Sequence, residues 1–184
     1  MFSLPPQKVE MALFLLLLVA AAYDIRYRRI PNWLTVTGVA VAFVVNALIG
    51  PPLAGLLFTL QGFALAFGIY MMLYIMHAMG AGDVKLMAAV GAMVGWQRWL
   101  GIFFITAIVG GIMAMLLILM RKRVKNTFWN MGFIVTELRS GRAAYLKNEE
   151  LDVRSKKAVG LPHGAVITVG FVFYIAASLW LQQH

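Results

Sequence analysis

The sequence predicts an all-α, polytopic membrane protein with six transmembrane helices. Of its 184 residues, 62% are hydrophobic, and the mean hydropathy is +0.83. Soluble domains are only about 45–50% apolar. Apolar runs recur along most of the chain, and the one at about residues 53–77 is long enough to cross about 30 Å of hydrocarbon. We therefore expect a single membrane-embedded domain that covers residues 1–184.

The apolar runs place the helices at about residues 10–24, 33–49, 53–77, 83–96, 99–120 and 162–181. The first run is similar to a signal peptide, but most of its flanking cationic residues follow it, which favours a retained helix. Pro31 and Asn32 predict the break before the second helix, and Gly50-Pro51-Pro52 predicts its end. In the short fourth helix, Gly91 and Gly95 are spaced for close helix packing.

The 16 lysine and arginine residues predict the orientation of the chain. Fourteen of them lie in or beside the connections that follow the first, third and fifth helices, whereas Lys8 and Arg98 lie on the opposite side. By the positive-inside rule, the side with fourteen is cytoplasmic and both termini lie outside. The net charge of +9 is accordingly attributed to topology and to anionic membrane lipids, and no nucleic-acid partner is expected.

One long polar segment, about residues 121–161, joins the fifth and sixth helices on the cytoplasmic side. Its apolar residues recur at helical spacing, which predicts an amphipathic helix lying in the membrane interface. A cytosolic helix packed on the bundle explains the same spacing, and the sequence leaves both alternatives open. The apolar positions are Phe128, Met131, Ile134 and Leu138.

The residue types present exclude several kinds of chemistry. The chain contains no cysteine, so disulfides, thiolate metal sites and a catalytic cysteine are ruled out. Its three histidines, His77, His163 and His184, are too scattered in the sequence to indicate a metal site. We therefore expect neither a metal nor another cofactor.

The seven acidic residues are the remaining candidates for chemistry, and the predicted topology sorts them. Glu10 lies at the outer end of the first helix, and four others lie in the polar segment, where hydration accounts for them. Asp24 ends the first helix and Asp83 begins the fourth, so both lie at the cytoplasmic membrane boundary, where a carboxylate is costly. Two facing carboxylates can share a proton: one takes a proton from water while the other polarises a peptide carbonyl. The pair predicts an aspartic protease.

Structural roles also account for these residues. Asp83 follows Gly80-Ala81-Gly82, a pattern typical of a helix cap whose carboxylate accepts backbone N–H groups. Asp24 is close in sequence to Arg26, Arg28 and Arg29 and could form ion pairs at the membrane boundary. Lys85 lies about 200° around a helix from Asp83, which favours an ammonium group at the lipid headgroups. Topology alone does not decide between these roles and catalysis.

Two motifs and their order make the sequence similar to the type IV leader (prepilin) peptidases, a family of membrane aspartic proteases. The stretch from Gly80 to Lys85 resembles the GxGD-x-K signature at the start of the family's fourth helix. The stretch from Asp24 to Thr35 resembles the segment that carries the first catalytic aspartate. Leu161 to Ala165 resembles the Pro-aromatic-Gly stretch before the last helix, with His163 where tyrosine is common.

The resemblance implies that Asp24 and Asp83 are catalytic and that Gly80, Gly82 and Lys85 support the site. Larger family members also carry a cysteine-rich segment and an N-methyltransferase activity. This chain has neither the cysteines nor the length of those members, so it resembles the short, protease-only form of tight-adherence (Flp-type) pilus systems. The implied substrates are prepilins or pseudopilins of the bacterial inner membrane, cut at the cytoplasmic face after a short basic leader. Pilus-assembly or secretion machinery and membrane lipids are the other partners implied.

Two further hypotheses concern recognition and rival functions. A basic leader is repelled by a face with fourteen cations, so Glu149, Glu150 and Asp152 are candidates for a local acidic binding site. The alternative function is a small membrane transporter or channel in which the aspartates bind a cation or a proton. Transporter sites usually lie near the bilayer midplane on broken helices, unlike two acids at one boundary. A catalytically silent assembly protein is a third alternative.

Overall fold

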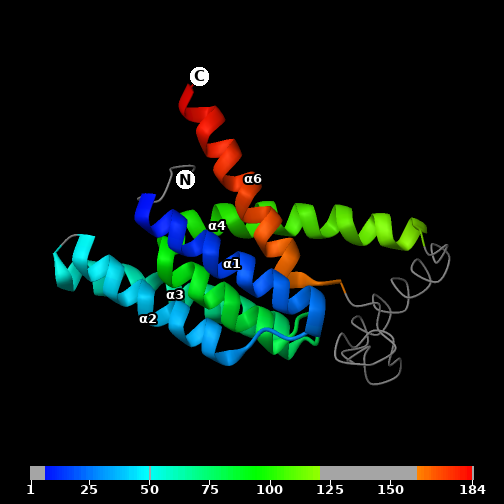
Figure 1. The fold of residues 1–184 in the computed structure, drawn as a ribbon, viewed down its shortest axis with the longest axis horizontal. Coiled ribbons are helices and arrows are strands. Elements are labelled where there is room, and N and C mark those ends of the chain that lie inside the picture. Colours follow the sequence, from blue (N-terminus) through cyan, green and yellow to red (C-terminus); the bar gives the residue numbers. More distant parts are fainter. Residues whose placement is uncertain (1–6, 50, 121–160, 184) are drawn as a thin grey trace, which may run out of the picture.

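The computed structural model describes residues 7–49, 51–120 and 161–183, and every element among them is a helix (Figure 1). The prediction of an all-α chain is therefore confirmed for these residues. The predicted amphipathic segment and the acidic residues Glu149, Glu150 and Asp152 lie outside the described residues. The helices are α1 (Gln7–Tyr27), α2 (Asn32–Ile49), α3 (Pro52–Ile75), α4 (Ala81–Met120) and α6 (His163–Gln183).

Four of the described helices are long and apolar enough to cross a membrane: α2, α3, α4 and α6. The fifth, α1, is not among them, because charged residues lie near both of its ends: Lys8 and Glu10 at one, Asp24 and Arg26 at the other. The chain is therefore a helical membrane protein, and the number of six spans stays a prediction.

The 40-residue helix α4 breaks at Gly95, whose φ of 76° and ψ of 165° are not helical. Along the first half of α4, Asp83 lies near Tyr70 of α3 and Gly91 packs on Gly62, whereas after the break Trp99 packs on Tyr70 again. The chain therefore reverses direction at Gly95, and Figure 1 shows the second half of α4 running back across the bundle. The predicted fourth and fifth helices correspond to these two halves.

The position of this break corrects one detail of the sequence analysis. The fourth helix was expected to end near residue 96 and the fifth to begin near residue 99, and Gly95 was expected to serve packing in the fourth. In the structure the reversal takes place at Gly95, because glycine adopts positive φ without a steric penalty. Gln97 and Arg98 instead lie in the first turn of the second half.

Close contacts at small residues hold the bundle together. A side chain at either Gly62 or Gly91 would overlap the backbone of the other, so glycine at these positions allows the close approach of α3 and α4. The second half of α4 packs antiparallel on α6, with Thr106 against Gly170 and Gly101 against Tyr174. Trp99 lies at the centre, fully buried, with its ring stacked on Phe103 at 5.3 Å between centroids.

Candidate active site

Asp24 lies in the last turn of α1 and is buried, with 8% of its surface exposed. Its Oδ2 accepts a hydrogen bond of 2.7 Å from the backbone N–H of Gly164, at the start of α6. Its own backbone carbonyl accepts the N–H of Arg28 at 2.9 Å, and Arg28 has a φ of 53° that turns the chain out of the helix. The carboxylate therefore faces the start of α6.

Asp83 lies in the first turn of α4 and is partly buried. Its Oδ2 accepts the backbone N–H of Gly80 at 3.2 Å, while the carbonyl of Gly80 accepts the N–H groups of Asp83 and Val84. An acidic side chain that bonds back to the residue before the helix is one half of a capping box. Asp83 therefore caps the start of α4 through Oδ2, which is part of the capping role considered in the sequence analysis. Its Oδ1 remains available for other chemistry.

The two aspartates come from helices far apart in sequence and lie within electrostatic range of each other. His163, the first residue of α6, and Tyr70 of α3 lie within electrostatic range of Asp83 as well. In each carboxylate, Oδ2 accepts a hydrogen bond from a backbone N–H. Among the described residues, none donates a hydrogen bond to Oδ1 of Asp24 or of Asp83. Each carboxyl group thus has one anchored and one available oxygen.

Two contacts join the start of α4 to the segment that follows Asp24. A Cβ atom at Gly82 would come within 3.3 Å of Cβ of Ile30, so glycine allows this close approach. The ammonium of Lys85 donates a hydrogen bond of 2.8 Å to Oδ1 of Asn32, the first residue of α2. Lys85 is exposed, but it bonds a protein partner that the sequence analysis did not identify.

The start of α6 is the part of the site that the sequence analysis missed. The stretch Pro162-His163-Gly164 was interpreted only as an entry into the last helix, yet Gly164 contacts Asp24 directly. One turn further, the single hydroxyl proton of Thr168 is shared between the carbonyls of Leu17 and Gly164, at 3.0 and 2.8 Å. No local pattern indicates the contacts with α1, because Gly164 lies 140 positions from Asp24 and Thr168 lies 151 positions from Leu17.

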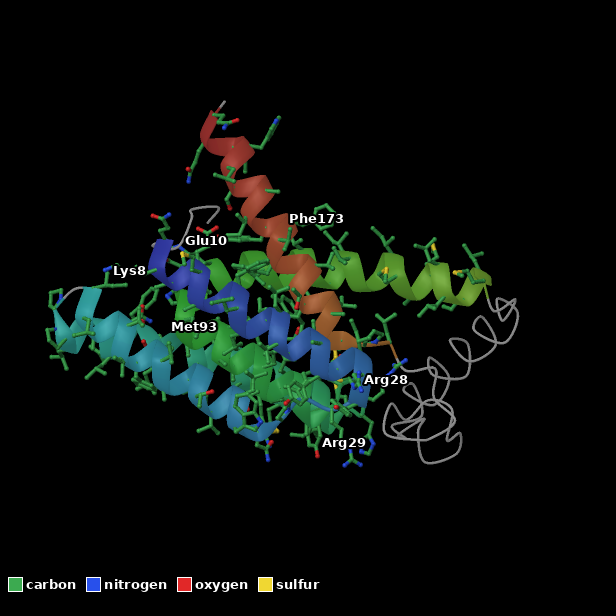
Figure 2. The ribbon with its side chains drawn as sticks, in the orientation of Figure 1. Lys8, Glu10, Arg28, Arg29, Met93 and Phe173 are labelled. Atoms are coloured by element: carbon green, nitrogen blue, oxygen red, sulfur yellow. The ribbon has the colours of Figure 1, made fainter. Side chains whose placement is uncertain are left out.

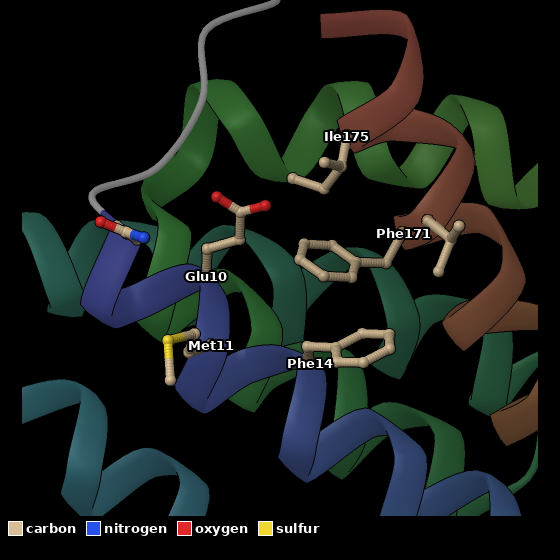
Figure 3. Close-up of a pocket in the computed structure, with 7 residues that line it drawn as sticks. Glu10, Met11, Phe14, Phe171 and Ile175 are labelled. Atoms are coloured by element: carbon tan, nitrogen blue, oxygen red, sulfur yellow. The ribbon is translucent and has the colours of Figure 1, made fainter. Parts of the chain in front are cut away.

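The remaining acid described, Glu10, lies at the far end of α1. Figure 2 shows Lys8 and Glu10 at one end of this helix and Arg28 at the other. Glu10 borders a cavity of about 380 Å³ between α1 and α6, lined mainly by apolar side chains (Figure 3). The lining of the cavity on α1 ends at Phe14, about 15 Å along the helix from Asp24. This cavity is therefore separate from the aspartates.

The described chain is thus a helical membrane protein in which two aspartates, from α1 and α4, lie within electrostatic range beside the start of α6. Residues 11–115, more than half of the sequence, match the type IV leader peptidase family, and the chain belongs to this family. The matched range contains both Asp24 and Asp83 and ends before α6. Comparisons with curated proteins and with solved structures found no match.

Proposed function

We propose that this protein is a membrane aspartic endopeptidase that removes the short basic leader from type IV, Flp-like prepilins or pseudopilins at the cytoplasmic face of the bacterial inner membrane. Membership of a peptidase family supports hydrolysis of a peptide bond. The observation that carries the proposal is the electrostatic proximity of Asp24 and Asp83, both within the matched range. The chain contains no cysteine that could act as an alternative nucleophile.

The proposed reaction uses one ionised and one protonated carboxyl group. The ionised aspartate takes a proton from water as the water oxygen bonds to the scissile carbonyl carbon, and the protonated aspartate gives its proton to the carbonyl oxygen. In the resulting gem-diol, the first aspartate returns its proton to the amide nitrogen and the second takes a proton from one hydroxyl. The C–N bond then breaks, which releases the leader as an acid and the mature segment as an amine. Both aspartates end in their starting states.

The backbone around the pair supports this chemistry. The amide groups of Gly164 and Gly80 each bond one carboxylate oxygen, which limits rotation of both side chains. Positioning of reacting groups is a large part of the rate enhancement of enzymes. Gly80, Gly82 and Lys85 are proposed to support the site by shaping the start of α4 against Ile30 and Asn32.

The test is co-expression with a prepilin, comparing the wild type with Asp24→Asn and Asp83→Asn. Each change keeps the shape of the side chain but removes its capacity to exchange a proton, so each should abolish leader removal at unchanged protein level. Glu10→Gln is the matched control, because it makes the same acid-to-amide change at the far end of α1, and it should cleave normally.

Cleavage that persists in either aspartate variant contradicts the proposed pair. The transporter alternative is tested on the same proteins in liposomes. A flux of cations or protons that disappears in Asp24→Asn and Asp83→Asn, without any prepilin cleavage by the wild type, would replace the peptidase proposal.

A further inference from the structure

The hydrogen bond between Gly164 and Asp24 is the shortest that either aspartate makes with a described residue. It joins α6 to α1 and is buried, so water does not compete for either group. A bond from an N–H to an ionised carboxylate is shorter and stronger than one between neutral groups. The length of 2.7 Å and the burial of Asp24 together indicate that this bond fixes the carboxylate.

The local structure of α6 directs this N–H at Asp24. The helix begins after Pro162, whose carbonyl accepts the N–H of Val166 at 3.2 Å. Proline has no side-chain acceptor, so the first N–H groups of the helix lack the usual partner from a capping residue. The N–H of Gly164 is satisfied by Asp24 instead, and the positive end of the helix dipole faces the same carboxylate.

Glycine at this position allows the approach. A Cβ atom at residue 164 would lie 3.1 Å from Cβ of Asp24 and 3.2 Å from its Oδ2. Thr168 makes a second polar contact between α6 and α1, because its hydroxyl donates a hydrogen bond to the carbonyl of Leu17 at 3.0 Å. Two polar contacts, one turn apart on α6, therefore set the position of α1 where it carries Asp24.

We propose that the backbone N–H of Gly164 is a positioning donor for the catalytic carboxylate of Asp24, so that the start of α6 is a third structural element of the active site. By bonding Oδ2, this donor would hold the carboxylate in one orientation and leave Oδ1 for the attacking water. The inference rests on the proposed peptidase function. It assigns a role to a part of the chain that lies outside the range matching the family.

The experiment compares three variants of the purified full-length protein in prepilin cleavage. Gly164→Pro adds a Cβ and removes the N–H, Gly164→Ala adds a Cβ and keeps the N–H, and Ala165→Pro places the same ring one residue later in the first turn of the helix. Proline is tolerated in this turn, where the N–H groups have no intrahelical partner. We expect kcat to fall about 100-fold in Gly164→Pro, as for a misplaced catalytic group, with KM unchanged. Gly164→Ala and Ala165→Pro should stay within about tenfold of the wild type.

The outcomes separate positioning from a simple helix cap. If Asp24 merely caps α6, Gly164→Pro removes the N–H group that needs a cap, and this variant should cleave prepilin as well as Gly164→Ala does. That result would overturn the inference and leave the proposed peptidase function in place. If the wild type cleaves no prepilin, the proposed function falls and the inference falls with it. If Gly164→Pro does not accumulate, Thr168→Val takes its place. Its kcat should fall with KM unchanged, and a kcat equal to that of Thr37→Val, which loses only bonds within α2, overturns the inference.

Discussion

The side-chain amide of Asn46, in α2, donates a hydrogen bond of 3.0 Å to the backbone carbonyl of Ala92, in α4. The carbonyl of Ala92 lies in the last turn before α4 breaks at Gly95, where a helix leaves its carbonyls without intrahelical partners. Asn46 also donates to Oγ1 of Thr59 in α3, at 2.9 Å. One side chain therefore joins three helices and caps the first half of α4, whose other end carries Asp83.

Replacing Asn46 by leucine should destabilise the protein by about 1 kcal/mol, the scale measured for polar contacts between membrane helices. The loss comes from the carbonyl of Ala92, which would lose its side-chain donor. Unfolding in a titration with denaturing detergent measures the change. Gln61→Leu is the control, because Gln61 is exposed on α3 and the same amide-to-leucine change there should be close to neutral. Equal stability of the two variants would contradict a capping role for Asn46.

The contact between Lys85 and Asn32 predicts energetic coupling between two positions 53 residues apart. Lys85→Met and Asn32→Leu should each slow prepilin cleavage by less than about fivefold, because an exposed polar contact contributes little. The double variant should be no slower than the slower single variant, since both changes remove the same contact. Initial rates in isolated membranes provide the measurement. Additive losses would show that Lys85 acts through another group, such as the lipid headgroups.

The sequence predicted a helical membrane protein, and this prediction has a physical basis, whereas the catalytic roles of the two aspartates stay predictions. Apolar runs mark helices that face lipid, because the bilayer imposes one length on all of them. Asp24 and Asp83 were expected at the same end of the bundle because successive spans alternate direction. The structure extends α1 to Tyr27, past the expected end at about residue 24, since a cation such as Arg26 is favourable in a last helical turn.

What the sequence did not predict depends on backbone geometry and on contacts between distant residues. The break in α4 follows the positive φ of Gly95, whereas the apolar runs predicted that the fourth helix continues to about residue 96. The partner of Asp24 is a backbone N–H, and every residue except proline has one, so Gly164 carried no chemical signal. The end of α3 is similar: His77 adopts a φ of 60°, a conformation usually associated with glycine, and Ala78 bonds back to Leu73 at 2.9 Å.

The close approach of α3 and α4 predicts a strong dependence on residue 91. Gly91→Ala should destabilise the protein by about 1–3 kcal/mol, because the new methyl group would overlap the backbone of Gly62 and the side chain of Ala66. Gly111→Ala is the matched control in the same helix, since nothing lies within 4 Å of a Cβ there. It should be neutral or stabilising by up to about 1 kcal/mol, as alanine favours helix formation. Both variants can be compared in the same detergent titration, and a Gly91→Ala variant as stable as Gly111→Ala would rule out this packing.

The acidic residues Glu149, Glu150 and Asp152 predict how the protein recognises a basic leader. Replacing all three by lysine should raise KM for cationic leaders several-fold and leave kcat unchanged, since charges near a binding site act mainly on encounter. The difference from the wild type should shrink as ionic strength rises, because salt screens exposed charges beyond about 8–10 Å. Glu10→Lys, a charge reversal on the predicted outer side, serves as the control and should leave KM as it is. A KM that does not change in the triple variant, or a change that persists in high salt, would mean that the leader is recognised elsewhere.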